Sequence, residues 1–400
     1  MKNYVCGKCK REFNSKQTLR KHKDEVCFKK PAVFSKVAFA VLFVLILSLL
    51  SPHAVHALSF PAGITNYVAL NISNSQTSAT PNPFQQMINI TSADSGWTYI
   101  NNTGNHFGQN VEFFYANGTI IPSWLEQYHS GYAIWWVKTG SIAASSTLTI
   151  YMGFANKTTN LFNTVNIGEA PQLSSTYAEY DDGSNVFPIY FNGNTPISDF
   201  TVGSGFSLTQ ATGVSFGSAT INAIHSTGDG SFPTFAWAYN KGVSNNPYVL
   251  EAVMQHIDTD ADVATIGFLD SSSSPANAES VYMGYASSFF ALTYKSAGTY
   301  IQAVNQQGSE NSNWNYYTVI YYGSSASSYY SSIVPQLYST TNGYYGTSSV
   351  NPLSSASSLY VGDDWGNSAS TPNNYYINWL RTRAYPPNGV MSSVSFGSVS

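Results

Sequence analysis

Three cysteines and one histidine near the start of the chain have the spacing of a metal site. They are Cys6, Cys9, His22 and Cys27, arranged as Cys-x2-Cys-x12-His-x4-Cys, and the 400 residues contain no further cysteine. Thiolate and imidazole groups are the ligands that Zn2+ prefers, and four of them complete the closed tetrahedron of a structural site. The spacing therefore predicts a bound Zn2+, against the alternative that the four residues match by coincidence.

Two apolar residues, Phe13 and Leu19, lie between the two ligand pairs and would form a small core. With them, the segment from Tyr4 to Cys27 resembles a ββα zinc finger whose last His is replaced by Cys. A module this short cannot fold on apolar burial alone, so metal binding would supply its folding free energy. We expect residues 1–30 to form a cytosolic head that contacts a protein partner; its basic helix could equally meet anionic lipid or nucleic acid.

An apolar segment follows the head. Residues 37–50 read VAFAVLFVLILSLL, and residues 32–57 are expected to form a transmembrane helix or a signal segment. The excess of Lys and Arg before this segment predicts that the N-terminus stays in the cytoplasm and that the larger part lies outside. Small residues at Val55 and Ala57 also allow cleavage after Ala57, which would release a secreted protein.

Charge divides the chain at the same place. Residues 1–36 contain 11 of the 17 Lys and Arg but only 3 of the 21 Asp and Glu, whereas the remainder contains 6 and 18. The net charges are +8 and −12, so nucleic acid is not expected to bind the portion beyond residue 37. That portion also has no cysteine and must fold without disulfides.

Beyond Leu58 the sequence alternates apolar and polar residues between turn signals, which predicts a mainly β protein. Asn117-Gly118 between two apolar runs predicts a tight hairpin. In STLTIYMGF, the residues Leu148, Ile150, Met152 and Phe154 are expected to share the buried face of one strand. The expected architecture is two tandem β-sandwich or jelly-roll domains after the finger and the hydrophobic helix.

The run from FFYANGTIIPSWLEQY through AIWWVK to SSTLTIYMGFAN resembles an archaeal surface domain, domain of unknown function 2341. The resemblance covers about residues 60–170 and implies a β-sandwich outside the cell, with no established catalytic residue. We therefore expect a β-sandwich domain at residues 58–170. The polar segment from Gly168 to Tyr177 contains Pro171 and is typical of a linker.

Residues 178–400 are expected to form the second domain. Long alternating strands such as PYVLEAVMQHI and WNYYTVIYYG, and a last strand that carries Trp379, resemble the concanavalin A-like jelly roll of laminin-G-like and lectin-like modules. Arg381, Arg383 and PPNGV resemble the ends of such domains in archaeal surface proteins. The resemblance implies a jelly-roll fold for this domain.

Asn-x-Ser/Thr triplets mark possible glycosylation sites at Asn71, Asn89, Asn101 and Asn156. A fifth triplet begins at Asn117 and is a poorer candidate because it lies in the predicted hairpin turn. An Asn- and Thr-rich β protein also produces such triplets through its composition alone, so that alternative stays open.

Three carboxylates at alternate positions, Asp258, Asp260 and Asp262, could surround Ca2+ with oxygen ligands. They lack the glycine and the distal glutamate of an EF-hand, and an acidic hairpin tip is the favoured alternative.

Catalytic patterns are weak by comparison. The acidic run Glu179-Tyr-Asp181-Asp182 is expected to be a polar turn, and the Gly-x-Ser-x-Gly around Ser215 precedes a predicted strand rather than the helix of a nucleophile elbow.

These observations predict a non-enzymatic cell-surface protein whose outer β domains bind glycan or an envelope protein. An extracellular polysaccharide hydrolase is the first alternative, for which two convergent acids would be required. A transmembrane signalling protein with a zinc-finger head is the second.

Overall fold

The computed structural model describes most of the chain beyond residue 57 and a few residues before it. The described residues are 3–6, 10–17, 20, 58–102, 106–228, 237–239, 241, 247–257, 264–269, 278–283, 290–296, 299–307, 314–321, 329–334, 344–348, 358–362 and 373–400. The chain divides into two compact units, Met1–Ala57 and Leu58–Ser400.

In the first unit, β1 (Tyr4–Val5) pairs antiparallel with β2 (Glu12–Phe13). This hairpin is the first half of the predicted finger. None of the helices that the structure describes is long and apolar enough to cross a membrane, and the segment 32–57 lies outside the described residues.

The first sandwich of the second unit is built from two sheets. Sheet 1 has the order β26-β3-β9-β5-β6, and sheet 2 the order β10-β7-β8-β4. The strands of sheet 1 are β26 (Ser393–Val399), β3 (Asn66–Asn74), β9 (Ser146–Phe154), β5 (Val111–Phe114) and β6 (Ile120–Ile121). Those of sheet 2 are β10 (Ile167–Glu169), β7 (Ser123–Tyr128), β8 (Tyr132–Thr139) and β4 (Phe84–Thr91).

Two predictions for this sandwich are confirmed. β9 has the expected bounds, and its residues Ile150, Met152 and Phe154 are buried in the core between sheets 1 and 2, with Leu148 packed against it. The hairpin between β5 and β6 turns at Asn117-Gly118, where Gly118 has a φ of 82°, a backbone conformation that favours glycine.

The second sandwich has an eight-stranded sheet 3 and a seven-stranded sheet 4 among the described residues. Sheet 3 runs β13-β14-β25-β16-β21-β22-β23, with β11 also paired to β25, and sheet 4 runs β12-β15-β24-β17-β18-β19-β20. The strands of sheet 3 are β11 (Ile189–Asn192), β13 (Phe206–Phe216), β14 (Ala219–Gly228), β16 (Tyr248–His256), β21 (Trp314–Tyr321), β22 (Tyr329–Val334), β23 (Tyr344–Ser348) and β25 (Asn373–Ala384). Those of sheet 4 are β12 (Phe200–Val202), β15 (Trp237–Tyr239), β17 (Ala264–Leu269), β18 (Ala278–Met283), β19 (Phe290–Ser296), β20 (Thr299–Gln307) and β24 (Ser358–Gly362).

Helical segments are short in the described part of the second unit. They are the α-helix α3 (Gly183–Val186) and 3-10 turns at Trp97–Tyr99, Ile197–Asp199 and Pro387–Gly389. Ser215 lies on β13, and the next element is the strand β14, as the sequence predicts. The prediction of a mainly β protein with stacked sheets is confirmed.

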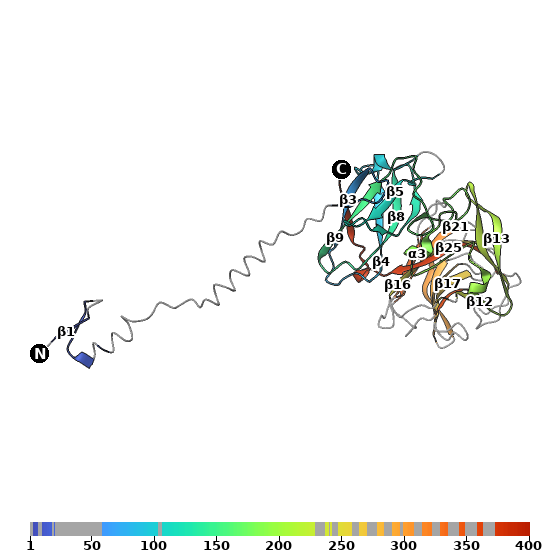
Figure 1. The fold of residues 1–400 in the computed structure, drawn as a ribbon. Helices are drawn as coiled ribbons and strands as arrows, with labels where there is room; N and C mark the ends of the chain where they lie inside the picture. The colour runs from blue at the N-terminus through green and yellow to red at the C-terminus, as the bar shows by residue number, and fades with distance from the viewer. Residues whose placement is uncertain are drawn as a thin grey trace. The chain divides into compact units, whose positions relative to one another are not determined.

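Three hydrophobic cores separate the four sheets, which are stacked in the order 1, 2, 3, 4. Figure 1 shows β3, β5, β8 and β9 of the first sandwich grouped together, beside β12, β13, β16 and β17 of the second. One core lies between sheets 1 and 2, and another between sheets 3 and 4. The third joins the two sandwiches: Trp124 and Trp136 from sheet 2 pack with Trp379 and Val253 from sheet 3. Sheets 2 and 3 are therefore covered on both faces, which explains why every residue of β7 except Tyr128 is buried and why no residue of β8 is exposed.

The domain boundary differs from the expected one in two ways. β26 pairs with β3, so the end of the chain completes the first sandwich, and Figure 1 shows the C-terminus beside β3. The expected linker is packed, because Pro171 and Gln172 are buried and the Tyr177 hydroxyl donates to the Asn378 carbonyl oxygen at 2.8 Å. The sandwiches are joined by an apolar core and buried polar contacts rather than by an exposed linker.

Candidate functional site

Sheet 3 presents a row of charged and aromatic side chains to sheet 2. On β25 the residues Trp379, Arg381 and Arg383 alternate on the face turned toward sheet 2, while Leu380 belongs to the core on the other face. Glu251 of β16 lies directly opposite Arg381 in the antiparallel register. The period of two along each strand thus places a cross-strand Glu–Arg pair between the two sandwiches.

Sheet 2 contributes Glu126 through an irregularity in β7. The pairing of β7 with β8 shifts between Leu125 and Gln127, which leaves Glu126 as the extra residue of a β-bulge. Trp136 of β8 donates its indole N–H to Glu126 Oε2. The bulge therefore directs a buried carboxylate toward sheet 3.

Arg381 connects the two carboxylates. Its Nη2 lies 2.8 Å from Glu126 Oε2 and its Nε 2.8 Å from Glu251 Oε2. Nη2 also donates to the Tyr316 hydroxyl at 2.8 Å, whereas Nη1 has no hydrogen-bond partner among the described residues. Four aromatic rings, Trp124, Trp136, Phe187 and Trp379, have centroids 4.7–5.1 Å from the guanidinium carbon. We call Glu126, Glu251, Arg381 and Arg383 the arginine cluster.

Arg383 is the outer member of the arginine cluster. Its Nε and Nη2 lie 3.0 and 2.9 Å from Glu251 Oε1, and its guanidinium carbon is 5.0 Å from the centroid of a Trp136 ring. Burial raises the pKa of Glu251, but Arg383 and Arg381 lower it more, to about 2. Burial lowers the pKa of Arg381, but Glu126 and other partners raise it further. Both groups of this pair are therefore charged at neutral pH.

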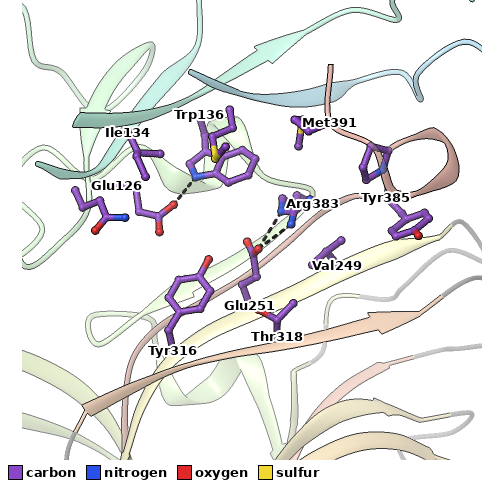
Figure 2. Close-up of a pocket in the computed structure, with 14 residues that line it drawn as sticks. Glu126, Ile134, Trp136, Val249, Glu251, Tyr316, Thr318, Arg383, Tyr385 and Met391 are labelled. Carbon is purple, nitrogen blue, oxygen red and sulfur yellow. Dashed lines mark hydrogen bonds and ion pairs between the residues drawn. The ribbon is translucent and has the colours of Figure 1, made fainter. Parts of the chain in front are cut away.

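A pocket of about 420 Å3 opens beside the arginine cluster (Figure 2). Its walls come from sheet 2 through Met87, Ile134 and Trp136, and from sheet 3 through Val249 and Tyr316, among others. Glu126, Glu251 and Arg383 also line it. Oε1 of Glu126 makes no hydrogen bond within the described part of the chain, which leaves one carboxylate oxygen to accept from a ligand.

A second group of buried carboxylates lies between the sandwiches without an arginine partner. Asp181 accepts hydrogen bonds from Trp124 Nε1 at 2.9 Å, Gly183 N at 3.0 Å, Tyr190 OH at 2.5 Å and Asn192 Nδ2 at 2.6 Å. The donors lie on β7, at the start of α3 and on β11, so the Asp181 carboxylate connects these three elements. The sequence predicted a polar turn here; the turn is present, but it connects the sandwiches.

Asp182 and Glu169 are fully buried beside Asp181. Burial raises the pKa of Asp182 well above its ordinary value and that of Glu169 to about 8. Ser174 donates to Glu169 Oε1 at 2.7 Å, and His106 Nδ1 lies 3.4 Å from the same oxygen. We call Asp181, Asp182 and Glu169 the acidic cluster.

The predicted zinc ligands are only partly within the described residues. Cys6 is buried at the base of the β1–β2 hairpin, where its backbone N–H donates to Arg11 O at 2.8 Å and its carbonyl accepts from Lys10 N at 2.9 Å. These backbone contacts of a buried cysteine with Lys10 and Arg11 are compatible with the first half of a Cys-x2-Cys knuckle. Cys9, His22 and Cys27 lie outside the described residues, so the Zn2+ site stays a prediction.

The calcium candidates Asp258, Asp260 and Asp262 also lie outside the described residues. Within the residues that the structure describes, no group of three or more His, Cys, Asp or Glu side chains could hold a metal ion. The Ca2+ site therefore stays a prediction.

The glycosylation candidates separate by exposure. Asn71, Asn89 and Asn156 are exposed. Asn101 is only 2% exposed, and its Nδ2 donates to His106 O at 3.1 Å, so the folded chain does not present it to solvent. Asn117 is exposed in the hairpin turn, where its Oδ1 accepts from Thr119 N.

One family model matches part of the chain. The family is described as "Domain of unknown function (DUF2341)", and it matches residues 107–193. The resemblance expected over about residues 60–170 is confirmed for residues 107–170. Residues 60–106 lie outside the match, which instead extends beyond residue 170 through the acidic cluster to β11, a strand of sheet 3. The matched range thus includes part of the junction between the sandwiches.

A curated relative is also similar over most of this chain. "Uncharacterized protein 562" of Sulfolobus islandicus rod-shaped virus 1 is 38% identical over 349 residues, which are 82% of this chain and 58% of the relative. The chain thus spans somewhat more than half the length of that viral protein.

Solved structures with partial similarity include lectins and a glucanase. Lectin I from Ulex europaeus, in complex with the methyl glycoside of alpha-L-fucose, matches at 10% identity with a TM-score of 0.33, covering 49% of this chain and 98% of the lectin. Bacillus licheniformis beta-glucanase matches at 10% identity with a TM-score of 0.31, covering 49% and 97%.

Proposed function

We propose that this protein is a non-enzymatic surface protein that binds neutral carbohydrate in the pocket between its two sandwiches. The observation that carries the proposal is the combination of one open carboxylate oxygen, on Glu126, with aromatic and apolar walls in a pocket of about 420 Å3. Small-molecule sites typically have volumes of roughly 300–1,000 Å3, mostly apolar walls and a few placed polar groups.

The polar groups of the pocket suit hydroxyl groups. Glu126 Oε1 can accept a hydrogen bond from a sugar hydroxyl, and the Tyr316 hydroxyl and the outer edge of Arg383 lie in the same pocket. The C–H face of a sugar ring can pack on the aromatic and aliphatic walls that include Trp136, Tyr385 and Met87. A single sugar could then contact both the polar groups and the apolar walls of the pocket.

The charge of the arginine cluster favours a neutral ligand. The negative charges of Glu126 and Glu251 are balanced by the positive charges of Arg381 and Arg383. Three of their four N–O distances are 2.8–2.9 Å, and the fourth is 3.0 Å. An anionic or cationic ligand would break this balance in a desolvated site, at a cost that a hydroxyl group does not incur.

Hydrolysis is the second candidate, since two glutamates line one pocket. A glycosidase requires one carboxylic acid that holds a proton near neutral pH, and usually a second, ionised carboxylate. Glu251 is unsuited to the first role because its two arginine partners lower its pKa to about 2. Glu126 shares its Oε2 with Arg381 and Trp136. We therefore propose binding without bond cleavage.

The location and the remaining partners belong to the same proposal. Residues 32–57 would anchor the protein in the membrane or direct its secretion, and the sandwiches would lie outside, where glycan or an envelope protein is met. The finger, with Zn2+ held by Cys6, Cys9, His22 and Cys27, would face a cytosolic protein partner if the anchor is retained.

The test is a panel of neutral oligosaccharides presented to the full chain, with binding measured beside reducing-sugar release. Ile134 lines the pocket without a polar role, so Ile134→Trp should fill it and weaken binding at least about tenfold. Val165→Trp, at a position 60% exposed and away from the pocket lining, is the matched control and should bind like the wild type.

Three results would contradict the proposal. The first is the absence of binding to every neutral oligosaccharide, and the second is equal binding by the folded Ile134→Trp variant. The third is release of reducing ends by the wild type but not by Glu126→Gln, which would favour the hydrolase.

A further inference from the structure

The segment that leaves β25 and enters β26 lines one end of the pocket. This segment, residues 385–392, is here called the strap. Tyr385, Pro386, Gly389 and Met391 of the strap all line the pocket. In Figure 2, Tyr385 and Met391 lie at one end of the pocket, and Glu126 and Ile134 lie at the other.

The strap is tightly folded. Backbone hydrogen bonds join Gly389 N to Pro386 O at 2.9 Å and Val390 N to Pro387 O at 3.0 Å. Gly389 has a φ of 73°, and a Cβ built there would lie 2.6 Å from the Tyr385 hydroxyl oxygen, so the tyrosine packs directly against the turn. Two prolines further reduce the conformations open to this turn.

Both sandwiches hold the strap in place. At its start, Tyr385 N donates to Pro247 O at 3.2 Å, and the preceding Ala384 N donates to Gln85 Oε1 at 2.9 Å. At its end, Gln86 Nε2 donates to Ser392 O at 3.0 Å. Gln85 and Gln86 are neighbours on β4 and fully buried. A segment tied at both ends to one buried strand is a fixed wall rather than a movable lid.

The remaining sides leave limited space for a long ligand. Sheets 2 and 3 form the two walls, and the packed core that contains Trp124 and Trp379 fills the space beyond Arg381. The volume of about 420 Å3 is near the lower end of the range for small-molecule sites. A polysaccharide that passed through would need a second opening where the strap lies.

We propose that the pocket takes the terminal one or two units of a neutral glycan, and that the strap sets this limit. This inference rests on the proposed function and makes it more specific. The rest of the glycan would leave the pocket on the side of Ile134 and Glu126, away from Tyr385. The protein would thus recognise chain ends and not the interior of a polysaccharide.

The wild-type full chain tests this inference with neutral oligosaccharides of one to six units. We expect affinity to rise to two units and then to stay within about twofold up to six, because later units lie outside the pocket. A bulky cap on one end of the ligand should weaken binding at least about tenfold, while the same cap on the other end should have little effect. An affinity that rises with every unit, together with tolerance of both caps, would overturn the inference and leave the proposed function intact.

Tyr385→Ala tests the role of the strap. Removal of the ring should open the closed end, so that affinity continues to rise for oligosaccharides longer than two units. The cap that weakens binding to the wild type at least about tenfold should then weaken binding less than about threefold. Val390→Ala is the control, since Val390 belongs to the strap but is 46% exposed and does not line the pocket. If Tyr385→Ala does not fold, Met391→Ala opens the same end. If a folded Tyr385→Ala or Met391→Ala variant kept the same length limit, the strap would not set it. If the wild type bound no oligosaccharide at all, the proposed function and this inference would both be overturned.

Discussion

The junction between the sandwiches contains two groups of carboxylates, and only one of them contacts arginine side chains. In the arginine cluster, Glu126 and Glu251 contact guanidinium groups, and the pKa of Glu251 falls to about 2. In the acidic cluster no Lys or Arg side chain is in contact among the described residues, although His106 Nδ1 lies 3.4 Å from Glu169 Oε1, and burial raises the pKa of Glu169 to about 8. The burial is similar, so the partner decides whether the carboxylate is charged.

This difference separates two tasks. The arginine cluster keeps fixed charges at the edge of a pocket, which is what recognition of a polar ligand requires. The acidic cluster uses neutral donors such as Trp124, Tyr190 and Asn192 to hold the turn before α3 against both sandwiches.

Replacing Arg381 should give the largest loss of stability. Arg381→Met leaves Glu126 and Glu251 buried without their shared cation, and we expect a loss of ~3–5 kcal/mol in the free energy of unfolding. Denaturant unfolding of the full chain measures it. Lys157→Met, at an exposed lysine, is the control and should change stability by less than ~0.5 kcal/mol. A loss below ~1 kcal/mol for Arg381→Met would show that the cation is dispensable.

Asp181→Asn tests the cluster that has no cation. The carboxylate accepts four hydrogen bonds, and an amide would turn its NH2 group toward two of the donors. The expected loss is ~1–3 kcal/mol, measured by the same unfolding experiment. Asp199→Asn, at a half-buried aspartate in a 3-10 turn, is the matched control. If Asp181→Asn and Asp199→Asn were equally stable, the proposed structural role of Asp181 would be wrong.

The pH dependence of stability should follow the acidic cluster between about pH 4.5 and 8. Because the pKa of Glu169 is raised from 4.5 to about 8, the folded state holds a proton that the unfolded state has lost. Stability from this group is complete below pH 4.5 and is lost as the pH rises toward 8, by up to ~1.4 kcal/mol per pH unit. Glu169→Gln should flatten this part of the profile. A profile that is equally steep in the variant would contradict the assignment.

Arg383→Gln should have the smallest effect. The Arg383 side chain is 15% exposed, and Glu251 retains Arg381 as a partner, so we expect a loss of about 1 kcal/mol. Arg383 is also the larger of the two causes that lower the pKa of Glu251, so the acid-unfolding midpoint should move to higher pH. Acid titration followed by tryptophan fluorescence measures the shift. A loss as large as that of Arg381→Met would mean that the two arginines act as one unit.

Much of the fold is readable from the sequence where a strand alternates apolar and polar residues. β9 shows this most clearly, since the period of two in STLTIYMGF assigns each residue to a face and the core contains the expected side chains. The partner of β26 is different: its short pattern, SVSFGSV, is compatible with an edge strand of either sandwich. Pairing between strands far apart in sequence depends on packing that the local pattern does not contain.

The candidate site could be anticipated only in part. Arg381 and Arg383 are the only arginines after residue 36, and they alternate on a strand that also carries Trp379, which is a visible signal. Glu251 gives a similar signal inside PYVLEAVMQHI. Glu126 gives no such signal in the sequence, because the direction of its side chain depends on a β-bulge in β7. Asp181 and Asp182 look like an ordinary polar turn until the second sandwich covers them.

The return of β26 to β3 has a consequence for protein synthesis. A ribosome releases β3 long before it releases β26, the neighbour that completes the sheet. Until then the outer edge of β3 can pair with a strand from another nascent chain. A gene truncated before the codon for Ser393 would leave that edge open permanently, and its product should accumulate in inclusion bodies although every strand of the second sandwich is intact.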